Sequence, residues 1–179
     1  LVLVSFVDNV AKVKHKIKEL EPEVIEAWEK LKNVGGIVPK INPEDLVFIG
    51  VRDTEESEDY VIANNSIYNV SVEYVRRNGV EKVSAEVLDY LKECDMLYLS
   101  FDVDSMDCDL VSYGTGTPVA NGITEQEASG LINHFLIDKR VGCFEVVEIN
   151  PCLDNKQNKM AETAFRILEN ATSIIEKRG

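Results

Sequence analysis

The chain has 179 residues, 45% hydrophobic and 28% charged, and its 32 acidic against 19 basic residues leave a net charge of -13. A chain of this length can bury a sizeable core, as one domain or as a large piece of one. An acidic surface repels phosphate backbones and anionic membranes, so we expect no nucleic-acid or membrane partner. The longest apolar runs are too short to cross a bilayer.

The cysteines suggest a reducing environment. Cys94, Cys108, Cys143 and Cys152 show no CxxC spacing, which argues against a zinc knuckle or a redox pair. Most of them lie beside or within apolar runs, so we interpret them as small core residues. The opening "LVLVSFV" is not typical of a signal peptide. We therefore expect a cytoplasmic location.

In chain order, the first 63 residues predict two helices, a strand and a third helix. Apolar stripes opposite polar faces predict helices over 8–20 and 22–32. A loop rich in glycine and proline leads to the apolar run 46–52, which is typical of a strand buried on both faces. Thr54 is placed to cap a helix over 54–63.

The next segment alternates strand and helix in the same way. Residues 66–71 predict a short strand, after which Ser71 begins a helix that stops near Gly79. Ser84 is placed to begin another helix. The apolar run 96–104 predicts the second strong strand.

The last third predicts a loop, a helix, a strand and a helix. Thr124 and Glu127 in "TEQE" form a capping box before an apolar helical face. Residues 141–150 predict the third strong strand, and an amphipathic helix of about twenty residues ends the chain. Alternating helices and unbroken apolar strands favour a parallel sheet flanked by helices.

Acidic residues gather where the strand 96–104 ends. Asp102 and Asp104 are two positions apart, so both side chains can face the same way. Neighbouring carboxylates repel each other unless a cation lies between them, and hard oxygen ligands suit Mg²⁺, Ca²⁺ or Mn²⁺. For Asp107 and Asp109 we favour solvated loop acids. Glu148 also falls at the carboxyl end of a strand, where parallel sheets place their chemistry.

Three kinds of site could use this "DxD" pair. An EF-hand is rejected because its required positions hold Met106, Asp107 and Tyr113. A haloacid-dehalogenase-like phosphatase would continue with Gly-Thr, whereas this chain continues with Ser105 and Met106, so it is a weak alternative. The third is a two-metal hydrolase, which the downstream residues favour.

Those residues read "YGTGTPVANGIT" and "EVVEINP" after "SFDVDSMD". In order and spacing they resemble the ureohydrolase family of arginases and agmatinases. The resemblance extends over essentially the whole chain, with "DLVFIGVRD" and "GITEQEA" also in place, and the asparagine of "EINP" is more similar to arginases. It implies a three-layer α/β/α fold with a mainly parallel sheet, as a single domain over residues 1–179.

The resemblance also implies a chemistry. In this family two Mn²⁺ ions in the complete active site share a bridging hydroxide, which attacks the guanidinium carbon and releases urea. The implied reaction is hydrolysis of L-arginine to L-ornithine and urea. Asp102 and Asp104 match the family's metal ligands, and Glu148 matches the glutamate that anchors the guanidinium group. Thr117 matches a supporting hydroxyl.

Two further acids have an open role. Glu55 and Glu58 fall where arginases recognise the substrate's α-amino group, but an exposed acidic first turn of a helix explains them equally well. Family members form trimers or hexamers, so the resemblance implies a homo-oligomer.

The family's other metal ligands come from "GGDH"-type and "DAHxD"-type stretches, which do not occur in these 179 residues. We interpret the two histidines, His15 and His134, as structural or surface residues. We therefore expect a carboxyl-terminal portion with an incomplete sheet, inactive and poorly stable by itself. A non-catalytic fragment or homologue remains an alternative, as does an agmatinase-type enzyme.

Overall fold

The computed structural model describes residues 21–37 and 39–178, which fall into two compact units. Of the described residues, one unit contains 21–37 and 39–48 together with Thr54–Asn69. The other contains Ile49–Asp53 and the chain from Val70 onward. The predicted helix over 8–20 lies outside the described residues. Within the described part of the chain, no helix is both long enough and apolar enough to cross a membrane.

The first unit is built from short elements. Helix α2 (Pro22–Lys32) begins at the predicted proline, and it is followed by the 3-10 turns η2 (Val34–Gly36) and η3 (Pro43–Asp45). Strands β1 (Val47–Ile49) and β2 (Tyr68–Val70) pair as a two-stranded sheet, and helix α3 (Glu56–Asn64) lies between them in sequence. A small core joins these elements through Leu46, Val61 and Ile67.

Two predicted boundaries in this unit are wrong. Strand β1 stops before Gly50, whose φ of 77° turns the chain out of the extended conformation. Helix α3 has Glu55 rather than Thr54 as its N-cap. The Thr54 hydroxyl donates instead to the Asp59 carboxylate, at 2.5 Å.

The second unit begins with two helices. Helix α4 (Val72–Asn78) is capped as predicted by Ser71, whose Oγ accepts the Tyr74 N–H at 3.1 Å. Helix α5 (Val80–Tyr90) begins directly after Gly79, so the predicted start at Ser84 is wrong. Ser84 lies inside α5, where its hydroxyl donates to the Val80 carbonyl at 2.7 Å.

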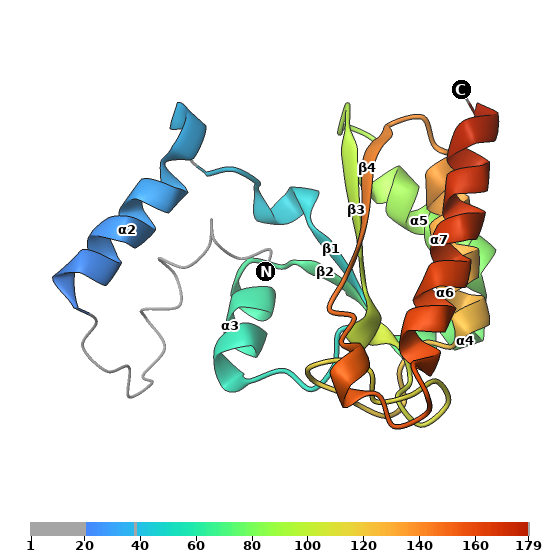
Figure 1. The fold of residues 1–179 in the computed structure, drawn as a ribbon. Coiled ribbons are helices and arrows are strands. Elements are labelled where there is room, and N and C mark those ends of the chain that lie inside the picture. The colour runs from blue at the N-terminus through green and yellow to red at the C-terminus, as the bar shows by residue number, and fades with distance from the viewer. Residues whose placement is uncertain (1–20, 38, 179) are drawn as a thin grey trace. The chain divides into compact units, whose positions relative to one another are not determined.

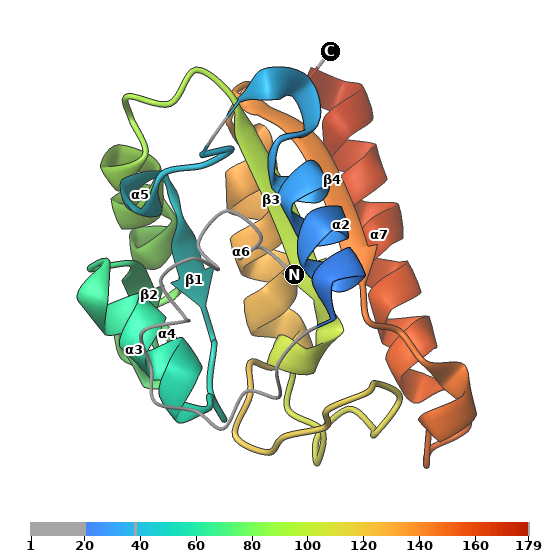
Figure 2. The same cartoon turned by 90° about the vertical axis from the view of Figure 1, so that its left-hand side faces the viewer.

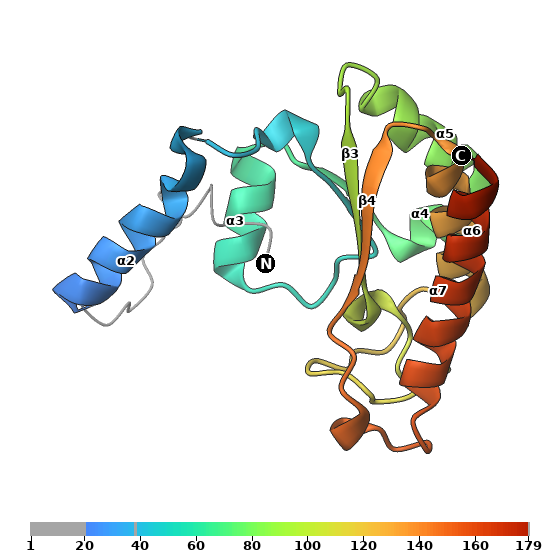
Figure 3. The same ribbon diagram turned by 45° about the horizontal axis from the view of Figure 1, so that its top comes forward.

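A parallel strand pair forms the centre of this unit. Strands β3 (Leu97–Asp102) and β4 (Val141–Val147) run side by side, as Figure 3 shows, with Leu97 opposite Val141 and Asp102 opposite Val147. Helix α6 (Glu125–Ile137) connects them, after the 3-10 turn η4 (Val103–Ser105) and a long loop. The predicted capping box at the start of α6 is confirmed.

Helices cover one face of the strand pair. Helix α6 packs against α5, β4 and α7 (Lys159–Arg178), and Figures 1 and 2 show α6 and α7 side by side along the pair. Side chains on the other face are more exposed; Tyr98 of β3 is 60% exposed. The core between strands and helices is formed by Phe101, Val103, Met106, Val111, Ile123, Ile132, Leu136, Val141, Met160, Ala164 and Ile167. The predicted α/β class with parallel strands is confirmed.

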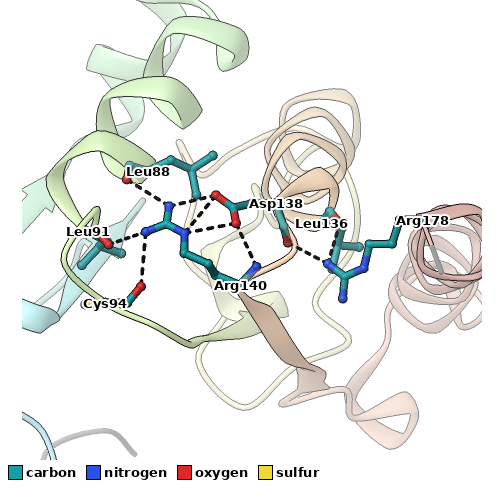
Figure 4. A network of polar contacts seen from close by, with 7 residues as sticks. All are labelled: Leu88, Leu91, Cys94, Leu136, Asp138, Arg140 and Arg178. Carbon is teal, nitrogen blue, oxygen red and sulfur yellow. Dashed lines mark hydrogen bonds and ion pairs between the residues drawn. The ribbon is translucent and has the colours of Figure 1, made fainter.

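Two arginines fix the beginning of β4 (Figure 4). The Arg140 guanidinium donates to the Asp138 carboxylate and to the carbonyls of Leu88 and Leu91 at the end of α5, at distances of 2.6–3.2 Å. Arg178 of α7 donates to the carbonyls of residues 136, 138 and 141. The bonds to the carbonyls of residues 88, 91, 136 and 138 satisfy groups that the ends of α5 and α6 leave without a helical partner.

Candidate functional site

Three predicted site residues lie at the carboxyl end of the β3–β4 pair. Asp102 is the last residue of β3 and is opposite Val147, so Glu148 follows immediately after its partner position. Asp104 lies in turn η4, directly after β3. The Asp102 carboxylate accepts the Asp104 N–H at 2.8 Å, which orders the turn. The expected meeting of Asp102, Asp104 and Glu148 at one edge therefore follows from the strand register.

Two threonines hold the Asp104 carboxylate. The Thr117 hydroxyl donates to Asp104 Oδ2, and the Thr115 hydroxyl donates to Asp104 Oδ1. Thr117 is exposed, whereas Thr115 is buried. Thr117 was predicted as a site residue and Thr115 was not, although both belong to the same "TGT" triplet. The structure thus brings Thr117 to the acidic pair and adds a second hydroxyl.

Glu148 has an unusual backbone. Its φ is 65°, in the left-handed region that residues other than glycine rarely adopt. Such conformations persist only where surrounding contacts enforce them, and they gather at functional sites. Here the Glu148 carbonyl oxygen lies 3.0 Å from Thr115 Oγ1. Two residues later, the Asn150 N–H donates to the Gly114 carbonyl at 2.8 Å. The loop 114–115 therefore fixes the turn that follows β4.

Arg52 fastens the loops that carry the other site residues. Its guanidinium donates to the carbonyls of residues 104, 105 and 106 at 2.9–3.1 Å, and to the carbonyls of Val119 and Ala120. Backbone hydrogen bonds join the same two segments, since Ile123 N–H donates to the Ser105 carbonyl and Asp107 N–H to the Ile123 carbonyl. No sequence motif predicts this role of Arg52.

The site carries unbalanced negative charge. Desolvation of the Asp102 carboxyl group raises its pKa, and the nearby charges of Asp104 and Glu148 raise it further, while the Asp104 N–H bond opposes them. A cation between these carboxylates would relieve the repulsion, and carboxylate oxygens are suitable ligands for Mn²⁺. Asp102 and Asp104 therefore fit part of a metal site. Among residues 21–37 and 39–178, no group of three or more acid, histidine or cysteine side chains is arranged to hold a metal ion.

Other predicted residues lie as follows. Glu55 and Glu58 belong to the first unit, at the start of α3, where Glu58 Oε2 accepts the Glu55 N–H at 2.8 Å. This is a helix-capping contact, and a role in substrate recognition stays a prediction. His134 of α6 contacts the Gly130 carbonyl at 2.7 Å, a structural contact, whereas His15 lies outside the described residues.

Two expectations about other side chains are corrected. Asp107 is only 7% exposed rather than solvated, because its carboxylate accepts the N–H groups of Asp109 and Leu110. Cys143 and Cys152 are exposed rather than core residues, while Cys108 is buried. All four cysteines are free thiols.

Comparison with known sequences identifies relatives of this chain. A family model described as the arginase family matches residues 32–173. The chain is 40% identical over 142 residues to an arginase of Bacillus subtilis, a match that covers 79% of this chain and 47% of that protein. It is 32% identical over 150 residues to human arginase-1, covering 81% and 45% respectively.

Solved structures agree with the sequence relatives. The crystal structure of Helicobacter pylori arginase superposes with a TM-score of 0.80 at 31% identity, covering 93% of this chain and 55% of that one. The arginase of Bacillus caldovelox gives a TM-score of 0.71 at 36% identity, with coverages of 79% and 47%. The chain thus spans about half the length of the relatives that it matches. By its sequence and its fold, this chain belongs to the arginase family.

Proposed function

We propose that this chain contributes the carboxyl-terminal part of the active site of a manganese-dependent ureohydrolase, which hydrolyses L-arginine to L-ornithine and urea. One observation carries the proposal. Asp102, Asp104, Thr117 and Glu148 converge at the carboxyl end of the β3–β4 pair, in a member of the arginase family.

Asp102 and Asp104 would hold manganese in this proposal. Both supply oxygen ligands from a turn that the Asp102–Asp104 hydrogen bond orders, and two threonine hydroxyls orient Asp104. Manganese, when bound, supplies Lewis-acid activation of water at neutral pH. In the complete active site we propose two Mn²⁺ ions, for which these two residues are part of the ligand set.

Glu148 would bind the substrate. Its carboxylate, at the end of β4, can accept charge-assisted hydrogen bonds from a guanidinium group, whose planar donors match a carboxylate. The left-handed backbone fixes the direction in which its side chain leaves the strand. The exposed Thr117 hydroxyl can support the same group. Glu55 and Glu58 are proposed to recognise the α-amino end of the substrate.

Urea release tests the activity. It is measured with Mn²⁺ on the protein as its gene encodes it, with L-arginine and agmatine as substrates. We expect Glu148→Gln to lower kcat/KM for arginine by about 10-fold to 100-fold, since a hydrogen bond to a charged group contributes roughly 1.5–3 kcal/mol. The control is Glu145→Gln on the same strand, whose carboxylate accepts the Ser100 hydroxyl at 2.8 Å and has no proposed role. Equal activity of the two variants would contradict the role of Glu148, and faster release from agmatine would favour an agmatinase.

Metal titration of the 179 residues addresses the non-catalytic alternative. Binding is measured as the loss of the electron paramagnetic resonance signal of free Mn²⁺. We expect Asp104→Asn to abolish this binding. Binding that Asp104→Asn leaves unchanged would refute Asp104 as a ligand. Analytical ultracentrifugation tests the proposed homo-oligomer, a trimer or hexamer, and fractionation of the source cells tests the proposed cytoplasmic location.

A further inference from the structure

Two Asn-Gly pairs occur in the sequence, Asn78–Gly79 and Asn121–Gly122. In such a pair the backbone nitrogen of the glycine can attack the side-chain amide of the asparagine, because glycine carries no side chain that blocks the approach. The reaction needs a free amide group, a free nitrogen and a backbone that can rotate. The structure holds these groups differently in the two pairs.

Every reacting group of Asn78–Gly79 is engaged in a hydrogen bond. Asn78 is the last residue of α4, and its Nδ2 donates to the Tyr74 carbonyl at 3.0 Å. Its Oδ1 accepts from Lys82 Nζ at 2.8 Å, and the Gly79 N–H donates to the Val75 carbonyl at 2.8 Å. Attack would require all three contacts to open first, so the fold protects this pair.

The reacting groups of Asn121–Gly122 are not held in this way. Within the part of the chain that the structure describes, neither the Asn121 side chain nor the Gly122 N–H takes part in a hydrogen bond. Asn121 is exposed and lies in the loop before α6. Its φ is 61°, in the left-handed region, which costs free energy for a residue other than glycine. Rotation of the Asn121 backbone toward the reactive conformation therefore relieves strain.

We propose that Asn121–Gly122 is a site of spontaneous deamidation in the folded protein, where Asn78–Gly79 is protected. The Gly122 nitrogen bonds to Cγ of Asn121 while its proton passes through water to the departing Nδ2, and ammonia leaves as a cyclic succinimide forms. Water then opens the ring at either carbonyl, which gives aspartate or iso-aspartate. Water is consumed and ammonia is released, and no residue of the candidate active site takes part.

Iso-aspartate would lengthen the main chain by a methylene group between two anchored carbonyls. The Ala120 carbonyl accepts from Arg52 Nε at 3.1 Å, and the Gly122 carbonyl accepts from Arg76 Nη2 at 2.7 Å. Gly122 cannot shift to absorb the change, because its backbone packs so closely that an added Cβ would overlap the Met106 backbone. The longer chain cannot keep both arginine contacts, so we expect deamidation to loosen this loop.

The test follows both pairs in the full 179-residue chain during incubation in mildly alkaline buffer. Peptide mapping by mass spectrometry measures the conversion of asparagine to aspartate at each pair, and electron-transfer fragmentation distinguishes iso-aspartate. A parallel sample in concentrated guanidinium chloride removes the folded structure from both pairs. Because the reacting residues are the same, the unfolded sample gives the rates that neighbouring residues alone would set.

We expect Asn121 to convert about 10-fold faster than Asn78 in the folded chain, since three hydrogen bonds must open before Asn78 can react. The two rates should converge in denaturant. Equal rates in the folded chain, or faster conversion at Asn78, would overturn the proposal. A difference that denaturant leaves unchanged would overturn it as well, because neighbouring residues and not the fold would then set the rates.

A matched variant tests the effect on the loop. Asn121→Gly removes the reactive amide and suits the left-handed backbone, so it is the unreactive control. Hydrogen exchange is measured at the Ile123 N–H, which donates to the Ser105 carbonyl at 2.9 Å. Exchange there should become faster during incubation of the unsubstituted chain and stay constant in Asn121→Gly. Constant exchange in an unsubstituted chain that has formed iso-aspartate would refute the loosening.

Discussion

Replacing Arg52 with methionine should loosen the two loops that carry Asp104 and Thr117. The guanidinium donates to five carbonyls of these loops, and methionine keeps most of the stem without a donor. At about 0.5–1.5 kcal/mol net for each intramolecular hydrogen bond, five bonds would contribute about 2.5–7 kcal/mol. Desolvation of the guanidinium group, which also lowers the pKa of Arg52, offsets part of this gain. We therefore expect Arg52→Met to cost about 2–4 kcal/mol of unfolding free energy.

Urea denaturation followed by circular dichroism measures this cost, and Mn²⁺ titration measures its effect on the site. Arg52→Lys keeps the charge but replaces five donors in a fork by three at one point, so it should lose about half as much. Arg166→Met is the control, because its partner Glu125 forms a partly exposed ion pair worth at most about 1 kcal/mol. If Arg52→Met proves no more costly than Arg166→Met, the carbonyl contacts do not hold the loops.

Three other substitutions test single features. Asp102→Asn keeps the acceptor for the Asp104 N–H but removes the negative charge. Because the pKa of Asp102 is raised in the folded state, ionisation of its carboxyl group destabilises the fold as pH rises. We therefore expect this variant to have a higher melting temperature at pH 7 in chelator and weaker Mn²⁺ binding. The Arg140 hydrogen bonds lower the pKa of Asp138, so this pair stabilises the fold above the ordinary value of 3.8 and loses that contribution as pH falls through the depressed pKa. Arg140→Met should therefore flatten the acid limb of the melting-temperature profile, and an unchanged limb would refute this. Thr124→Ala should cost α6 about 1 kcal/mol in chemical denaturation, and a loss near zero would mean that Glu127 caps the helix alone.

Local sequence patterns correctly predicted the helix caps, which depend on hydrogen bonds between residues close together in the sequence. The capping box at Thr124 and the cap at Ser71 form because their partners are three residues away. The helix start predicted at Ser84 is wrong because serine, which often caps helices, also fits inside a helix when its hydroxyl donates to the carbonyl four residues earlier. The competing start at Gly79 is a backbone feature that composition does not reveal.

The candidate site was predictable to the extent that strand ends are predictable. Asp102 and Glu148 meet because two parallel strands end in register, which the apolar runs already indicated. The contacts of Thr115 and Arg52 could not be predicted in this way, since all their partners except the Gly50 carbonyl lie 11 to 68 positions away and most are backbone carbonyls. Asp107 was misjudged for a related reason, because whether a loop carboxylate is solvated depends on how the loop folds over it.

The arginine contacts have a consequence for sequence variation. Arg52 and Arg178 donate their hydrogen bonds to backbone carbonyls, and Arg140 does so in part. A carbonyl is present whichever side chain a residue carries, so partly exposed positions such as Val119, Ala120 and Leu91 can change without removing the acceptor. In each contact only the arginine must keep its side chain. Homologous chains could therefore drift at the carbonyl positions while the arginines stay fixed, and paired substitutions would not reveal that these segments touch.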